Sequence, residues 1–182
     1  MSAPLDFRVV YYPDPVLRKV AKPVEAFDDE LRATVAAMFE LMYRSEGCGL
    51  AAPQTGLEKR ILVVNPTGDP AKKEHELTLV NVTIVERSGP VTLLHEGCLS
   101  FPEIYAEIKR PERCRVMAFD PSGNKFEAEY SGLLARVVQH EYDHLEGVLL
   151  VDRMSPADKA RNKGALAEFV DTYRRSQSAG AR

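Results

Sequence analysis

The stretch GLLARVVQHEYDHLEG, residues 132–147, has the apolar spacing of an amphipathic helix. At about 100° per residue, one stripe of this helix carries the residues Leu133, Val137, His140 and His144, with Glu141 slightly to its side. The two histidines therefore occupy positions at which a helix normally buries apolar side chains. The stretch predicts a central helix with two buried imidazoles, around which the rest of the chain folds.

His140 and His144, with Glu141 directly after the first, match the pattern H-E-x-x-H. Two imidazoles one helical turn apart can bind one metal ion, and the adjacent carboxylate can act as a general base beside the open coordination position. The alternative is a pair of core histidines and a surface acid. Because burying both imidazoles without partners would be unfavourable, we favour a metal site.

A hydrolytic metal site needs a third protein ligand and an open position for water. The metzincin pattern would place a third histidine at position 150, where this chain has Leu150. A later glutamate, Glu168, lies far along the predicted terminal helix and is a poor candidate. Cys98, in HEGCLSFP, has a more suggestive context, since Gly97 permits close backbone approach and Pro102 is expected to end the extended run. One cysteine and two histidines would form a chemically complete ligand set.

Composition limits the class of protein. With 182 residues and 45% hydrophobic content, we expect one catalytic domain over residues 1–182, with a flexible tail over about 176–182. The net charge of −3 and the pI near 5.9 argue against a nucleic-acid or anionic-membrane surface. The opening residues lack a signal-peptide pattern, and no run approaches the roughly 18 apolar residues of a membrane span. We expect a bacterial cytoplasmic location, and the mature form of an organelle protein stays open.

The remaining segments predict an α+β fold. Residues 26–47 have helical apolar spacing, and residues 155–175 begin with a Ser-Pro cap and predict a C-terminal helix. Short β-type runs lie between, at 60–65, 76–86, 91–99, 114–120 and 125–130, the last two joined by the turn PSGN. We therefore expect antiparallel β-sheets packed around a central metal-binding helix, flanked by an N-terminal and a C-terminal helix. The three cysteines are an odd number without close pairing, which argues against a disulfide framework.

Three segments together resemble the signature motifs of peptide deformylases. They are GCGLAAPQ (47–54), EGCLS (96–100) and QHEYDHLEG (139–147). The similarity spans roughly residues 7–170, and EGCLSFPEIYAEIKRP is most similar to the plant-organelle-like branch of the bacterial-type enzymes. The resemblance implies removal of the formyl group from the N-terminal formyl-methionine of nascent chains, with release of formate. It also implies a metal ion held by Cys98, His140 and His144.

The resemblance implies ferrous iron as the physiological ion, whereas Cys/His coordination by itself ordinarily suggests zinc. Zinc, nickel or cobalt are possible in a purified sample. In the expected mechanism, metal-bound water attacks the formyl carbon, and Glu141 takes its proton and then hands it to the leaving amine. The family pattern assigns the oxyanion donors to the Gln54 side chain and the Leu99 backbone N–H. The implied partners are formylated nascent polypeptides at the ribosome, with no nucleic-acid or membrane site.

An enzyme that serves many nascent chains should read the peptide main chain and little beyond the first side chain. We expect an extended peptide to pair with strand edges near Gly47, Cys48, Gly49 and Gly97. The candidates for the walls and rim of a methionine pocket are Cys48, Leu133, Val137 and Tyr105. Cys48 is a small residue between two glycines that needs no chemical role, and we favour that interpretation over a functional one.

Two further residues, Glu96 and Arg110, match family positions that support the metal loop and the substrate cleft, either as a buried pair or as a surface contact. Two other functions also stay open, namely a metallopeptidase that uses the same helix and a deformylase-like protein kept only for binding. The presence of Glu141, Gln54 and Cys98 together argues against the second of these, because a protein kept only for binding would have no need of all three.

Overall fold

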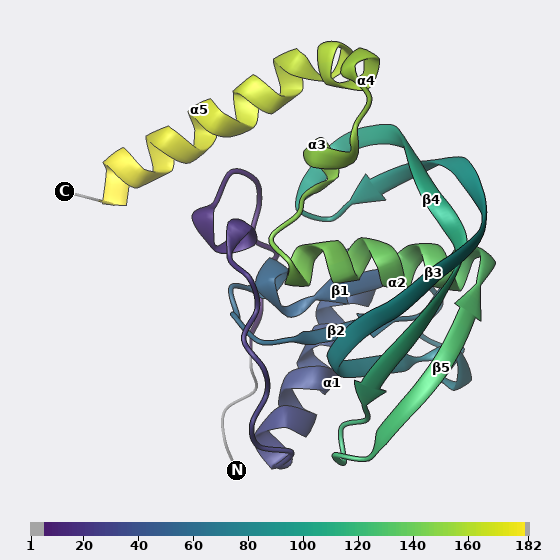
Figure 1. Cartoon of the computed structure of the whole chain (residues 1–182). Coiled ribbons are helices and arrows are strands. Elements are labelled where there is room, and N and C mark those ends of the chain that lie inside the picture. The colour runs from purple at the N-terminus through teal and green to yellow at the C-terminus, as the bar shows by residue number, and fades with distance from the viewer. Residues whose placement is uncertain (1–5, 181–182) are drawn as a thin grey trace.

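The structure is a computed structural model that describes residues 6–180. Five strands form one antiparallel sheet in the order β1-β2-β3-β4-β5, which is also their order in the chain. Their bounds are β1 Gly49–Ala51, β2 Ile61–Val64, β3 Leu77–Cys98, β4 Phe101–Phe119 and β5 Lys125–Ser131. The helices are α1 Asp29–Arg44, α2 Gly132–Leu145, α3 Leu150–Arg153, α4 Pro156–Arg161 and α5 Lys163–Gly180. The expected α+β class and the antiparallel pairing are confirmed (Figure 1).

Helices α1 and α2 pack against opposite faces of the short strand β2. Because side chains alternate along a strand, Ile61 and Val63 join a cluster with α1, whose core residues include Leu31, Val35, Met38 and Met42. Leu62 and Val64 join a second cluster with Ala135 and Val138 of α2. The helix that carries the two histidines is therefore central, as predicted, with β1, β2 and α1 on one side of it and parts of β3 and β4 together with α3 on the other (Figure 1).

Helix α1 begins where its sequence indicates. The side chain of Asp28 accepts a hydrogen bond from the Leu31 N–H at 3.0 Å, which satisfies one of the unpaired donors at the helix start. Asp29 and Glu30 follow in the first turn, where negative charge is favourable.

Strands β3 and β4 differ from the sequence prediction. The sequence predicts separate runs at 76–86 and 91–99, but β3 is one strand that continues through an irregular stretch, with a register shift between Ser88 and Val91 around Gly89 at φ 78°. The first half of β4 was not predicted at all. The chain reverses at Leu99 and Ser100, so Pro102 lies within β4, and the expectation that it ends the extended run was wrong.

Only the first residues of β3 pair with β2. Leu77 to Val80 contact β2, whereas the pairs that β3 makes from Thr83 to Cys98 in the described chain are with β4. The far edge of β3 over residues 91–98 is therefore free of a strand partner within the described residues. This stretch ends at Cys98, next to the predicted metal site.

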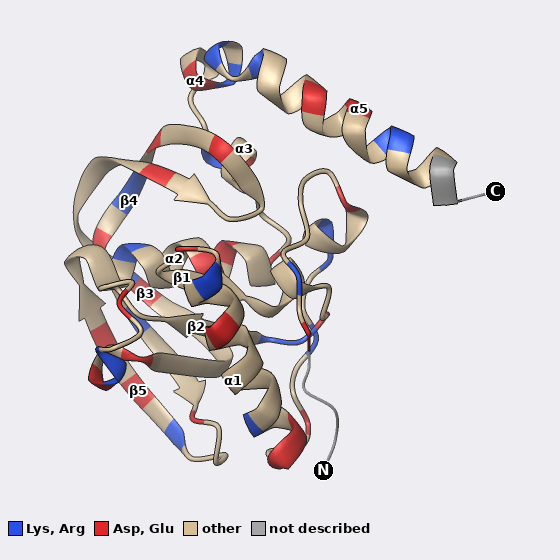
Figure 2. Cartoon of the chain, turned by 180° about the vertical axis from the view of Figure 1, so that it is seen from behind, with Lys and Arg blue, Asp and Glu red and all other residues tan. Residues whose placement is uncertain are grey.

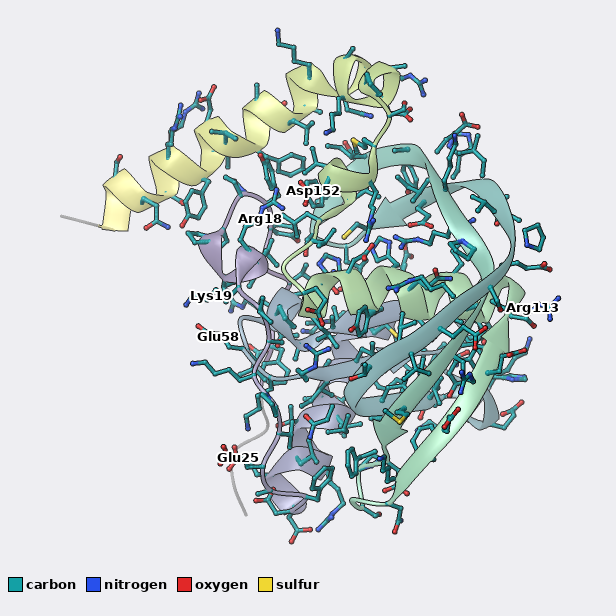
Figure 3. All side chains as sticks on the ribbon, in the orientation of Figure 1. Arg18, Lys19, Glu25, Glu58, Arg113 and Asp152 are labelled. Atoms are coloured by element: carbon teal, nitrogen blue, oxygen red, sulfur yellow. The ribbon has the colours of Figure 1, made fainter. Side chains whose placement is uncertain are left out.

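A third cluster supports the beginning of β4. Ile104, Ala106 and Ile108 pack against Leu17 of the N-terminal loop and Leu149 near α3. The loop approaches closely at Gly147, whose φ is 70° and where a Cβ would lie 2.4 Å from the Arg18 carbonyl oxygen, so only glycine fits there without a shift of the backbone. The Arg18 and Asp152 side chains also form an ion pair between the loop and α3 (Figure 3).

The C-terminal region forms two helices in place of the single helix expected over 155–175. The side chain of Ser155 caps α4, as the sequence indicated, but α4 ends at Arg161 and α5 starts at Lys163. Helix α5 then runs to Gly180 and projects beyond the sheet (Figure 1). The tail expected over 176–182 thus lies partly within α5, and residues 181–182 lie outside the described residues.

Charged residues of both signs are distributed over the helices and strands (Figure 2). Within the described residues, no helix combines the length and the apolar character that a membrane crossing would require.

Candidate metal centre

Three predicted ligands converge from two elements. Cys98 is the last residue of β3, and His140 and His144 lie one turn apart on α2. One ligand atom from each of the three lies within 4.8 Å of the others. The Cys98 Sγ is 3.2 Å from the His144 Nε2, and the two imidazole centroids are 5.3 Å apart. Sulfur and nitrogen donors at this spacing suit the tetrahedral coordination of one cation, such as Zn²⁺ or another transition-metal ion.

The Glu96 carboxylate orients His140. Its Oε2 lies 3.0 Å from the His140 Nδ1, which leaves the Nε2 of this ring for a metal ion. Glu96 is buried, and although burial raises its pKa, hydrogen bonds from His140 and Arg110 lower the pKa to about 2. The group therefore stays ionised at neutral pH.

Arg110 and Asp143 extend this support. Arg110 binds both oxygens of Glu96, at 2.7 and 2.9 Å, and its other nitrogen donates to Asp143 at 2.9 Å. Asp143 in turn accepts from Arg153 at 2.6 and 3.0 Å. The Glu96–Arg110 contact that the sequence left open is thus a buried pair rather than a surface contact.

His144 has the environment of a neutral ligand. It is 1% exposed, and its Nδ1 has no hydrogen-bond partner among the described residues. Burial, together with the nearby His140, lowers its pKa well below the ordinary value. A buried imidazole that stays unprotonated keeps the lone pair that a metal requires. The residues that are present therefore fit a bound cation.

Glu141 is buried beside the three ligands. It is 4% exposed, so the alternative of a surface acid was wrong. Its Oε2 has no partner among the described residues. Burial, the largest cause, raises its pKa to about 7. A carboxyl group in this state can both accept and release a proton near neutral pH.

Gln54 lies in the short turn Ala52–Thr55 and is buried. Its Oε1 accepts a hydrogen bond from the Ala51 N–H at 2.8 Å. Its Nε2 lies 3.3 Å from the Ser100 Oγ and 3.7 Å from the Cys98 Sγ. The hydrogen bond from the Ala51 N–H therefore holds the Gln54 amide in its position next to the metal ligands. Leu99, the other predicted oxyanion donor, follows Cys98 directly in the turn between β3 and β4.

Glycines bring the backbone close to these groups. A Cβ at Gly49 would lie 2.5 Å from the Glu141 Oε1 and 2.6 Å from Val137, and one at Gly47 would lie 2.8 Å from Leu99. A Cβ at Gly97 would lie 2.8 Å from the Tyr105 ring. The structure thus brings both predicted peptide-pairing segments to the site.

The predicted pocket residues divide into two groups. Val137 is buried and Cys48 is partly buried, with a thiol pKa that burial raises. Leu133 is 56% exposed, so it does not continue the buried stripe of α2 as the helical period suggested, and Tyr105 is 63% exposed. A separate cavity of about 840 Å³ lies between α5 and the N-terminal loop, and none of the residues that line it is a predicted site residue.

Three residues near the site were not among the predicted site residues. Ser100 binds Gln54, Asp143 binds Arg110, and Arg136 binds Glu96. A usable signal existed for Arg136, because it precedes His140 by four residues and so faces the same way on α2. Asp143 lies between the two histidines, where its polarity on a buried helix was also informative.

Comparisons with known proteins agree with this geometry. The family model for polypeptide deformylase matches residues 7–160. A chloroplastic/mitochondrial peptide deformylase 1B from Arabidopsis thaliana is 48% identical over 148 residues, which cover 81% of this chain and 54% of the relative. The chain spans about half the length of this relative and of a similar rice protein. A peptide deformylase from Thermotoga sp. (strain RQ2) is 43% identical over 93% of this chain and 99% of its own length.

Solved structures are similar over nearly the whole chain. A plant peptide deformylase, PDF1B, superposes with a TM-score of 0.93 at 41% identity and covers 98% of this chain and 96% of its own. The peptide deformylase of Plasmodium falciparum gives 0.89 at 41% identity, over 92% and 97% of the two chains. With the ligand geometry, the matched family model and these similarities in agreement, the chain belongs to the polypeptide deformylase family.

Proposed function

We propose that this chain is a metal-dependent peptide deformylase, which removes the formyl group from the N-terminal formyl-methionine of newly made proteins and releases formate. The observation that supports this most directly is the group formed by Cys98, His140 and His144, beside a buried Glu141 oxygen that lacks a partner among the described residues. Family membership supports the substrate class, which is formylated nascent polypeptides.

Three protein ligands leave a coordination position for water or substrate. A bound cation would supply Lewis acidity, which polarises a carbonyl group and makes water acidic enough to lose a proton near neutral pH. We propose Fe²⁺ as the physiological ion, following the family resemblance, and we expect Zn²⁺, Ni²⁺ or Co²⁺ in protein purified in air. Elemental analysis of protein prepared with and without oxygen distinguishes these ions.

Glu141 is the proposed proton carrier. Its free oxygen takes a proton from the attacking water and later gives it to the amine that leaves the formyl group. The close approach of Gly49 supports this role, because the glycine backbone and Val137 limit how far the carboxylate can move. The result is free formate and a peptide with an N-terminal amine.

Gln54 and Leu99 are the proposed donors to the oxygen that becomes negative as water adds to the formyl carbon. The bond from the Ala51 N–H fixes the Gln54 amide, so that its N–H group is in place before the reaction starts. The Leu99 backbone N–H adjoins Cys98 in the same turn. Donors that need no rearrangement are the ones that stabilise a transition state most strongly.

The substrate main chain is proposed to pair with the free edge of β3 near Gly97 and with residues 47–49. This mode of binding suits an enzyme that accepts many sequences, since backbone hydrogen bonds do not depend on side chains. Val137 and Cys48 are the proposed walls of the methionine pocket, and Leu133 and Tyr105 are its proposed exposed rim. The relatives come from bacteria and plant organelles, and we propose one of these two settings for this chain.

The deciding experiment compares formyl-Met-Ala-Ser with Met-Ala-Ser. A deformylase releases formate from the first peptide and leaves the second intact. Cleavage of a peptide bond in Met-Ala-Ser would instead show a metallopeptidase, and the absence of any product with metal-loaded protein would show a protein kept only for binding. The metal-loaded Glu141→Gln variant, assayed in parallel, controls for a contaminating enzyme.

A further inference from the structure

Arg136 connects the helix that carries the histidines to the free edge of β3. It lies four residues before His140 on α2 and is 6% exposed. One terminal nitrogen donates to the Glu96 Oε1 at 2.6 Å and to the Ile108 carbonyl at 3.0 Å. The other donates to the Thr92 carbonyl at 2.9 Å and to the Thr92 hydroxyl at 2.7 Å. The guanidinium thus has four acceptors on two neighbouring strands.

Glu96 receives two arginines and one histidine. Arg136 and the Arg110 Nε share its Oε1, while the second Arg110 nitrogen and the His140 Nδ1 share its Oε2. Rotation of this carboxylate would move the oxygen that orients His140. Arg110 also binds Asp143, so the position of Arg110 depends on a second carboxylate besides Glu96. Arg136 adds a contact to Glu96 that is independent of Asp143.

The Thr92 contact distinguishes Arg136 from an ordinary buried ion pair. Thr92 lies in the stretch of β3 that has no strand partner on its far side among residues 6–180, and this stretch ends at Cys98. Its carbonyl and hydroxyl are both bound to a side chain of α2. The same guanidinium therefore holds the strand that delivers the thiolate ligand and the carboxylate that orients a histidine ligand.

We infer that Arg136 is a positioning residue for the metal centre. It fixes His140 through Glu96, and it fixes the free edge of β3 through Thr92, so that the ligands from the two elements keep one relative position. The part that concerns metal binding stands on the ligand geometry, and the part that concerns substrate pairing along β3 rests on the proposed function.

The test uses Arg136→Met, which keeps much of the side-chain length and removes all four hydrogen bonds. Metal affinity is measured by competition with a chelator, using Zn²⁺ as the probe. We expect a loss of about 10- to 100-fold, which is typical when a group that supports a ligand is removed. Backbone amide hydrogen exchange over residues 91–97 should become faster in the same variant. With formyl-Met-Ala-Ser, KM should rise in metal-saturated protein, because the pairing strand is less fixed.

Arg115→Met is the matched control. Arg115 also binds two carboxylates, Glu86 and Glu127, but it does so on the exposed side of the sheet. A general effect of losing a charged, carboxylate-bound arginine would appear in both variants, so we expect wild-type zinc affinity in Arg115→Met. Thr92→Val removes the hydroxyl contacts with Arg136 and with the Arg110 carbonyl but keeps the bond from Arg136 to the Thr92 carbonyl, and we expect faster exchange over 91–97 with little change in zinc affinity.

If Arg136→Met does not fold, Arg136→Lys gives the decisive result, because lysine keeps the charge but offers one nitrogen in place of two. We then expect a loss of zinc affinity on the order of tenfold. Wild-type zinc affinity in a folded Arg136→Met variant, or in Arg136→Lys where only that variant folds, would overturn the inference. The zinc measurements do not need enzymatic turnover, so they remain decisive even if the wild-type protein releases no formate.

Discussion

Replacing Gly49 with alanine tests whether the backbone of β1 holds the Glu141 carboxylate in place. The added methyl would lie 2.5 Å from the Glu141 Oε1 and 2.6 Å from the Val137 Cγ1, where ordinary contact begins at 3.4 Å. The atoms must therefore separate by about 0.9 Å. Both neighbours are buried on α2, and β1 is paired with β2, so the surroundings cannot absorb the change easily. A misplacement of about 1 Å at a reacting group can lower the rate about 10²-fold.

We expect the kcat of Gly49→Ala for formyl-Met-Ala-Ser to fall about 10²-fold. The metal content should stay at the wild-type level, because no ligand is changed. Overpacking should lower the free energy of unfolding by about 1–3 kcal/mol and the Tm by about 2–12 °C. These quantities are measured by steady-state kinetics, elemental analysis and thermal unfolding.

Gly164→Ala is the matched control for this experiment. A Cβ at Gly164 meets no described heavy atom within 4 Å, and alanine favours a helix over glycine. We expect wild-type kcat and an unchanged or slightly higher Tm. A Gly49→Ala variant with a lowered Tm but wild-type kcat would refute the claim that this packing positions the carboxylate.

Further predictions concern single side chains. Glu141→Gln should retain metal and lose 10²-fold or more in turnover, since a general base typically contributes about that much; full activity in the metal-loaded variant would place the base elsewhere. Cys98→Ser should lose metal in elemental analysis, and unchanged metal content would mean a different third ligand. Gln54→Ala should lower kcat by roughly 10²- to 10³-fold, whereas a change in KM alone would indicate ground-state binding. Burial raises the pKa of Cys114 to about 11 from an ordinary 9.0, so its thiol should stay unalkylated at pH 8 in the folded protein, as mass spectrometry can measure. Because the folded-state pKa is the higher one, the stability that this thiol contributes should be lost between pH 9 and 11, and rapid alkylation at pH 8 would contradict its burial.

The parts of the fold that the sequence predicts are those with a uniform period. Residues 26–47 and 132–147 each have one apolar stripe, and both form helices that bury it, apart from Leu133 at the start of α2. Strand β4 was missed in its first half, although Ile104, Ala106 and Ile108 alternate with exposed residues. The buried partner that continues this alternation is Arg110, and a charged residue at a core position hides the pattern. Arg110 is buried because it pairs with the Glu96 carboxylate on the neighbouring strand. The sequence around Arg110 does not indicate that such a partner will be present.

The metal ligands were predictable because each lies in a short motif with a chemical reason. Their support was predicted only in part. The resemblance indicated Glu96 and Arg110, but whether they form a buried pair and whether Asp143 joins them depends on β3, β4 and α2 meeting in the folded chain. For Leu133, in contrast, the sequence pattern predicted burial that the folded chain does not provide. Its helical phase is correct, but it lies in the first turn of α2, beyond the core that covers the rest of the stripe, and it is exposed.

The edge of β3 that lacks a strand partner in the described part of the chain also has a consequence for the protein in crowded solution. Free backbone N–H and C=O groups along a strand form a template for any extended chain, including the same edge of another copy. Proteins usually prevent such contacts with lysine or proline at the edge, but residues 91–98, VTLLHEGC, contain neither, and Val91, Leu93 and Leu94 are exposed there. If this edge pairs with varied peptides, as proposed, it cannot carry such residues, and we expect self-association and aggregation to begin at this strand.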